Sequence, residues 1–283
     1  MRIEESRSAG ARGVQLQQIT WLPEFEATDA VVIAHGYGEH SGRYSHVAAA
    51  LVEDGFAVHA LDHRGHGRSE GPTVNVEHFQ DYVEDLDLVV MAAKVRHPGA
   101  TFLLGHSMGG LIAADYATQH QARLTGLILS GPAVMRRRVS PTLNLIARVL
   151  ARIAPATGVL KLPLEAISRD PEVVRRYQAD PLVHAVPMRA RQAVQSVDAQ
   201  TRLETRLGSI TIPVLVMYGA ADRIVDPASA AFVEARIGSS DRTVKRYEGL
   251  YHEIFNEPEK EVVLADLRAW LAGHRGTGTA ARP

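Results

Sequence analysis

The chain of 283 residues carries 31 Lys and Arg residues against 32 Asp and Glu residues, so its formal net charge is −1 and no charge excess draws it toward nucleic acid. It has no cysteine, which excludes disulfide bonds, thiolate metal sites, iron–sulfur clusters and a cysteine nucleophile. Hydrophobic residues make up 46% and charged residues 22%, the balance of a globular rather than a disordered chain.

Neither a secretory signal nor a membrane span is predicted. Residues 1–13 carry several charged side chains with no apolar stretch behind them. No window reaches the ~18 uninterrupted apolar residues that a spanning helix needs. We therefore expect a cytoplasmic protein.

Short aliphatic runs alternate with longer helical patterns along the chain. Strands are predicted at 31–34, 56–61, 101–104, 127–129, 213–217 and 243–247. Helices are predicted at 44–53, 79–94, 111–120, 228–236 and 258–272. This alternation indicates an α/β fold, with a mostly parallel central sheet that has helices on both faces.

One region interrupts the alternation. Between residue 131 and about residue 207 no strand is predicted, and prolines and arginines are frequent. A stretch of this length inside an alternating pattern is typical of an insertion. We therefore expect a discontinuous core of residues 1–131 and 208–283, with residues 132–207 as an inserted helical cap.

The segment Gly105–Gly109 fits the pattern G-x-S-x-G and follows directly on a predicted strand. A helical pattern begins right after it. Strand, sharp turn and helix are the context of a nucleophile elbow, in which Ser107 would be the nucleophile. The alternative is a glycine-rich turn with an ordinary capping serine.

A serine nucleophile needs a base and an acid that orients the base, and in this fold they follow in the order acid, then histidine. Asp222 follows the fifth predicted strand and His252 follows the sixth, both at strand ends where α/β sheets place their sites. Asp226 is a rival acid, but it precedes Pro227 and a helical pattern, which predicts a helix N-cap. The alternatives are a solvated loop acid at Asp222 and a surface histidine at His252.

The other histidines fit less well as the base. His35 ends a strand, and His106 lies inside the elbow, where we expect packing. His63 and His66 have a spacing that could suggest metal ligands, but no acid or cysteine accompanies them at ligand spacing. We interpret their loop as hydrogen-bonded structure and expect no metal.

An oxyanion hole needs two backbone N–H groups, one of them from the residue after the nucleophile. That residue is Met108. The other donor should come from the glycine-rich loop after the first predicted strand, where Tyr37 would offer its N–H.

Several of these segments together resemble monoacylglycerol lipases of the α/β-hydrolase superfamily, especially bacterial members. The resemblance spans about residues 31–271 and is carried by 34–44, 61–69, 105–110, 167–182 and 247–253. It implies Ser107, Asp222 and His252 as catalytic triad and Tyr37 and Met108 as oxyanion donors. It also implies that Glu39, Arg43 and Tyr177 help to bind the glycerol end of the substrate. Tyr37 departs from the family pattern, in which smaller or aliphatic residues are usual, so we expect the mouth of the site to differ in shape.

The implied activity is hydrolysis of monoacylglycerols to glycerol and fatty acid through an acyl-enzyme, with no cofactor or metal. A lysophospholipase or a general short-chain carboxylesterase of the same fold is the alternative. Ser107 argues against dehalogenases and epoxide hydrolases, which carry an aspartate at the elbow. A non-catalytic protein of this fold would usually have lost a triad residue, and all three candidates are present.

The expected cap contains an apolar helical stripe. Leu143, Ile146, Leu150 and Ile153 fall on one face, and Arg136, Arg137 and Arg138 precede it. One interpretation is transient contact with a membrane or lipid-droplet surface, which would make the protein peripherally membrane-associated. The other is that the stripe packs inside the cap and the arginines are solvated.

Overall fold

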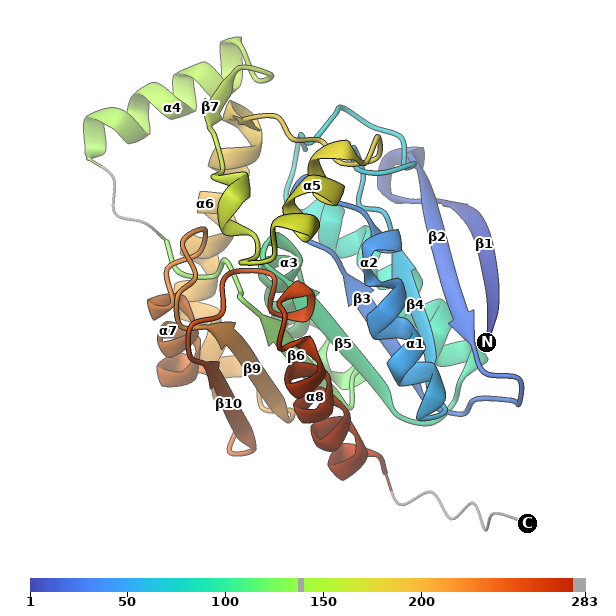
Figure 1. Cartoon of the computed structure of the whole chain (residues 1–283). Coiled ribbons are helices and arrows are strands. Elements are labelled where there is room, and N and C mark those ends of the chain that lie inside the picture. The colour runs from blue at the N-terminus through green and yellow to red at the C-terminus, as the bar shows by residue number, and fades with distance from the viewer. Residues whose placement is uncertain (137–139, 277–283) are drawn as a thin grey trace.

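The computed structural model describes residues 1–136 and 140–276. Within them, an eight-stranded sheet forms the centre of the molecule (Figure 1). In spatial order its strands are β1 (Arg2–Ala9), β2 (Gln15–Leu22), β4 (Ala57–Leu61), β3 (Ala30–Ala34), β5 (Thr101–His106), β6 (Gly126–Ser130), β9 (Val214–Gly219) and β10 (Arg242–Tyr247). The last six in this order run parallel to one another, and β1 and β2 join antiparallel at one edge.

All of the predicted strands occur, but the hairpin of β1 and β2 precedes the first strand that we expected. β1 is mostly exposed and rich in charged residues, so it carries no hydrophobic alternation that the sequence could reveal. Charge on an edge strand is a common means of preventing edge-to-edge aggregation. The hairpin extends the parallel sheet without changing the fold class.

Helices cover both faces of the sheet, because the buried strands are apolar on both sides. On β3, Val31 and Ile33 join the apolar cluster of one face, and Val32 joins that of the other. The first face is covered by α1 (Ser45–Glu53) and α8 (Lys260–His274). The second is covered by α2 (Gln80–Arg96), α3 (Met108–His120) and α7 (Ala228–Arg236). The predicted α/β-hydrolase architecture is confirmed.

The segment between β6 and β9 lies over the carboxyl edge of the sheet (Figure 1). It contains α4 (Pro141–Ile153), α5 (Pro171–Ala179) and α6 (Ala190–Arg206). The expectation that it has no strand is wrong, because β7 (Gly158–Leu160) pairs with β8 (Met188–Arg189) in a separate two-stranded sheet. Strands of this length are too short to show a periodic pattern.

The long helix α6 connects this segment to the core. Gln195 accepts a 2.9 Å hydrogen bond from the N–H of Phe79, and Gln192 accepts a 2.9 Å bond from the hydroxyl of Tyr82. Helix α4 packs on α6 and extends away from the sheet (Figure 1). The described residues also form short 3₁₀ helices, at Ala11–Gly13, Ser41–Tyr44, Gln121–Arg123, Leu164–Ala166, Leu207–Ser209 and Ile254–Asn256. No helix in the described part of the chain combines the length and the apolar character needed to span a bilayer.

Candidate active site

Ser107 lies in a strained turn between β5 and α3. Its backbone has φ +56° and ψ −114°, an uncommon conformation for a residue other than glycine. The flanking glycines are sterically required, because a Cβ on Gly109 would lie 2.1 Å from the carbonyl oxygen of Ala34. The Ser107 side chain makes no capping hydrogen bond to α3, so the alternative of a capping serine is wrong.

The structure brings Ser107 together with His252 and Asp222, each from a different strand end. The Oγ of Ser107 lies 2.8 Å from Nε2 of His252, and Nδ1 of His252 lies 2.6 Å from Oδ2 of Asp222. The Nδ1–H donates to the carboxylate, which leaves Nε2 free to accept the serine proton. All three side chains are buried. This geometry can activate a hydroxyl for nucleophilic attack.

The two candidate acids have separate environments. Oδ1 of Asp222 accepts the N–H groups of Ile224 and Val225 at 2.8 and 3.0 Å, which orients Oδ2 toward His252. Asp226 instead accepts the N–H of Ala228 at 2.9 Å, at the start of α7. The helix starts one residue later than predicted, because Pro227 rather than Asp226 is the N-cap of α7, and Asp226 lies just before it.

The charge of Asp222 sets the protonation of His252. Burial disfavours the imidazolium, but the carboxylate of Asp222 and its hydrogen bond raise the pKa of His252 above its ordinary value, with further contributions from Glu253 and Glu39. His106 packs against it, with ring centroids 4.7 Å apart. Burial, followed by the charge of His252, lowers the pKa of His106 to about 4. His106 is therefore neutral at pH 7, as a packing residue should be.

Two backbone donors are available beside the nucleophile. Neither the N–H of Tyr37 nor that of Met108 has a hydrogen-bond partner among residues 1–136 and 140–276. Met108 is the first residue of α3, whose N-terminus carries a partial positive charge. The loop of Tyr37 lies against Ser107, because a Cβ on Gly36 would be only 3.3 Å from the Ser107 Cβ. The pair can stabilise an oxyanion on a carbonyl attacked by Ser107.

The residues that the resemblance implies for glycerol binding also meet in the structure. Arg43 forms an ion pair with Glu39, and its guanidinium lies 4.6 Å from the ring centroid of Tyr177 on α5. Arg43 also forms a bidentate pair with Glu253, at 2.8 and 2.6 Å. No role for Glu253 was predicted from the sequence. The available signals were its position directly after His252 and its place in the segment 247–253, which carries the family resemblance.

The loop with His63 and His66 lies beneath the loop of Tyr37. His35 donates from Nδ1 to the carbonyl of Gly36 at 2.7 Å and accepts the N–H of His63 at Nε2, 2.9 Å away. The ring centroids of His35 and His63 are 4.3 Å apart. Within the described residues, no group of three or more His, Cys, Asp or Glu side chains is arranged to hold a metal ion. The buried imidazoles support the loop beside Ser107.

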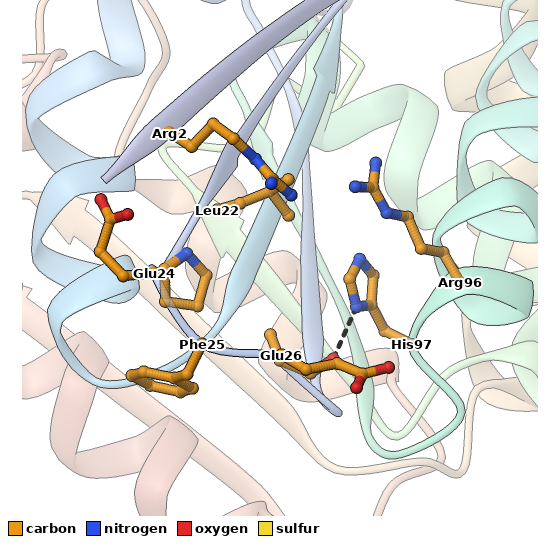
Figure 2. A pocket seen from close by; sticks show the side chains of 9 residues that line it. Arg2, Leu22, Glu24, Phe25, Glu26, Arg96 and His97 are labelled. Atoms are coloured by element: carbon orange, nitrogen blue, oxygen red, sulfur yellow. Dashed lines mark hydrogen bonds between the residues drawn. The ribbon is translucent and has the colours of Figure 1, made fainter.

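A surface pocket of about 370 Å³ lies away from this site (Figure 2). It is lined by the start of β1, the end of β2 with the loop that leads to β3, and the end of α2, whereas Ser107 lies at the carboxyl end of β5. Figure 2 shows His97 at its wall, donating a 2.8 Å hydrogen bond to the carbonyl of Ala27. The lining mixes Arg2 and Arg96 with Glu24 and Glu26 and includes no serine or aspartate. It lacks the groups needed for acyl transfer.

Known proteins of one family are similar to the chain over almost its whole length. The family described as serine aminopeptidase, S33, matches residues 26–259. The chain is 42% identical to a monoacylglycerol lipase of Mycolicibacterium smegmatis, over 95% of this chain and 97% of that protein. It is 35% identical to a monoglyceride lipase of Homo sapiens, over 93% and 89%. The crystal structure of a Paleococcus ferrophilus monoacylglycerol lipase matches with a TM-score of 0.78 at 30% identity, covering 97% of this chain and 100% of that one.

Proposed function

Because the chain belongs to the monoacylglycerol lipase family of the α/β-hydrolases, we propose that it hydrolyses monoacylglycerols to glycerol and a free fatty acid. The observation that carries this proposal is the hydrogen-bonded series Ser107, His252, Asp222 beside two backbone N–H groups that have no hydrogen-bond partner among the described residues. No other group is needed for ester hydrolysis by an acyl-enzyme route.

In the first half-reaction, Oγ of Ser107 attacks the ester carbonyl while Nε2 of His252 accepts the serine proton. Asp222 holds the ring and stabilises the imidazolium. The N–H groups of Tyr37 and Met108 stabilise the oxyanion. The tetrahedral intermediate formed by this attack collapses when His252 donates the proton to the departing glycerol oxygen, and the acyl group stays on Ser107.

In the second half-reaction, water attacks the acyl-enzyme. His252 accepts a proton from the water, and the same two N–H groups stabilise the second oxyanion. Collapse returns the proton to Ser107 and releases the fatty acid. We assign Glu39, Arg43 and Tyr177 to the glycerol end of the site. We assign residues 132–207 as the cap and residues 1–131 and 208–283 as the hydrolase core.

We further propose that α4 contacts a membrane or lipid-droplet surface transiently, as suits a cytoplasmic enzyme with a lipid substrate. On the apolar stripe, Leu143, Ile146 and Ile153 are 54%, 56% and 76% exposed, which argues against packing inside the cap. Leu145 and Val149 widen the exposed apolar surface. Arg136 is exposed and pairs with Glu204 at 3.2 Å, whereas Arg137 and Arg138 lie outside the described residues.

Hydrolysis assays test the proposed function. Purified protein is given 1- and 2-monoacylglycerols of several chain lengths, diacylglycerol, lysophosphatidylcholine and p-nitrophenyl esters, with Ser107→Ala as control. We expect the highest kcat/KM on a monoacylglycerol and a loss of about 10⁴-fold or more in Ser107→Ala. A preference for lysophosphatidylcholine or for short p-nitrophenyl esters would contradict the substrate assignment. Activity that survives in Ser107→Ala would contradict the mechanism.

A further inference from the structure

The carboxylate of Glu39 is bonded into the loop that carries Tyr37. Its Oε1 accepts the N–H of Gly36 at 2.6 Å and the hydroxyl of Tyr44 at 2.7 Å, and its Oε2 accepts from Arg43. Only 3% of Glu39 is exposed. Three of its roughly four acceptor positions are therefore taken within the protein. The bond to Gly36 fixes the His35–Gly36 peptide, and His35 bonds the carbonyl of Gly36 in the next peptide, which carries the N–H of Tyr37. Glu39 therefore helps to hold the loop that presents this N–H.

Arg43 connects this loop to the loop of His252. Its Nη1 and Nη2 donate to the two carboxylate oxygens of Glu253, the residue after His252. Asn256 donates a further 2.9 Å bond to Glu253, whose own N–H donates to the carbonyl of Ile167 at 2.8 Å. The Glu39–Arg43–Glu253 cluster thus joins the oxyanion loop to the histidine loop.

The cluster carries a net negative charge next to the site. Two buried carboxylates share one guanidinium, so its formal charge is −1 when all three groups are ionised. Asp222 from the loop after β9 lies 2.6 Å from Nδ1 of His252, and the ring of His106 at the end of β5 packs against it. Glu253 is the next residue in its loop, and Arg43 links Glu253 to Glu39 of the oxyanion loop. His252 is therefore surrounded mainly by acids. In a buried site such charges are only weakly screened.

We propose that Glu39 and Glu253 are positioning residues for the acyl-transfer reaction. Glu39 holds the oxyanion loop in place, and both carboxylates stabilise the protonated form of His252 through the Arg43-linked cluster. This inference rests on the proposed function for the chemistry that it assists. It gives Glu39 a role that does not require contact with the substrate.

Glu39 has both proposed roles, holding the loop and supplying negative charge, whereas Glu253 supplies only the charge. The isosteric variants Glu39→Gln and Glu253→Gln should therefore differ in their effects. Glu39→Gln removes a negative charge and places an amide N–H against the guanidinium of Arg43, so the loop should shift as well. We expect a kcat about 10- to 100-fold below wild type, because the oxyanion donor is misplaced. Glu253→Gln removes the same charge without touching Gly36, so its loss in kcat should be smaller.

Both variants should also shift the pH dependence of kcat/KM. Replacing a residue with a merely structural role would not shift it. Without one acid, the imidazolium of His252 is less stable, so the acidic limb of kcat/KM should move about 0.5 to 1 pH unit lower. Asp266→Asn is the matched control, because Asp266 pairs with Lys245 and Tyr247 away from the site. Its acidic limb should coincide with that of wild type.

Titration of His252 by ¹⁵N NMR, assigned against His252→Ala, measures the same shift without turnover. It therefore separates a failure of this inference from a failure of the proposed function, which the hydrolysis assay with Ser107→Ala reports. If Glu39→Gln does not fold, the titration of His252 in Glu253→Gln alone decides whether the charge of the cluster stabilises the imidazolium. The inference is overturned if the folded variants titrate like wild type, or if Asp266→Asn shifts as much as they do.

Discussion

Asp115, which is fully buried on α3, accepts a 3.0 Å hydrogen bond from Arg202 on α6. Within the described part of the chain, its other oxygen accepts only from Gln119, at 3.3 Å. Because α3 begins next to Ser107 and α6 belongs to the segment between β6 and β9, this ion pair joins that segment to the helix behind the nucleophile.

Arg202→Ala should destabilise the protein by about 1–3 kcal/mol, since it leaves a buried carboxylate with one weak donor. Urea unfolding measures the change. Arg206→Ala is the control on the same helix, because Arg206 is exposed and its loss should change stability by less than about 0.5 kcal/mol. Equal values for the two variants would show that the ion pair contributes nothing to stability.

Asp222 and Asp226 should differ sharply when each is changed to asparagine. Asp222→Asn removes the charge that stabilises the imidazolium and favours the wrong tautomer of His252, so kcat should fall about 10⁴-fold. Asp226→Asn keeps an oxygen that can accept the N–H of Ala228, so its kcat should stay close to wild type. Steady-state kinetics on a p-nitrophenyl ester compare them. A large loss in Asp226→Asn would transfer the orienting role to that residue.

When the pH is lowered, kcat/KM should fall with a midpoint above pH 6.5, the ordinary pKa of histidine. His252 must be neutral to accept the proton of Ser107. Burial opposes its charged form, but Asp222, Glu253 and Glu39 together raise the pKa of His252 above its ordinary value. Protonation, and with it the loss of base, therefore begins at a higher pH than for a free histidine. The profile of kcat/KM from pH 5 to 9 at constant ionic strength gives the midpoint, and a midpoint below 6.5 would contradict this assignment.

Two glycines should respond to alanine in opposite directions. In Gly109→Ala the new Cβ would lie 2.1 Å from the Ala34 carbonyl oxygen and 2.5 Å from that of His35, both backbone atoms. We expect a loss above about 3 kcal/mol or no folded protein. Gly273 lies on α8, and beyond its chain neighbours and the helix backbone no atom of the described residues would lie within 4 Å of a Cβ there. Gly273→Ala should therefore gain about 0.5–1 kcal/mol. Thermal unfolding of both variants checks the contrast.

Replacing apolar residues of α4 should weaken attachment to lipid. Leu143→Ser combined with Ile146→Ser removes two exposed aliphatic side chains, each worth about 1.5–3 kcal/mol if fully buried in lipid, so vesicle binding should fall at least about tenfold. Cosedimentation with anionic vesicles measures it. Val95→Ser with Val262→Ser is the control, because these exposed side chains lie on α2 and α8. Unchanged binding in the α4 variant would favour solvated arginines and a cap without lipid contact.

The parts of the fold that the sequence predicted are those with strong local signals. The aliphatic strands around Val31 and Leu103 are buried on both faces, so their composition alone identifies them. The hairpin strands β1 and β2 and the short strands β7 and β8 were missed, because none of them shows the aliphatic run or the clean alternation that identifies a strand. At the site, Ser107 and His252 were predictable from motif and chain order, whereas the pairing of Arg43 with Glu253 joins residues 210 positions apart.

By itself, the sequence determined the class of fold and the chemistry available to it. The absence of cysteine excluded a thiolate nucleophile, and a glycine-flanked serine after an aliphatic strand indicated Ser107. Only the tertiary structure decided which carboxylate oxygen meets His252, how Arg43 divides its bonds between Glu39 and Glu253, and that the apolar face of α4 is exposed. The physical reason is that helix and strand patterns depend on neighbours along the chain, whereas these contacts depend on how distant loops pack at one edge of the sheet.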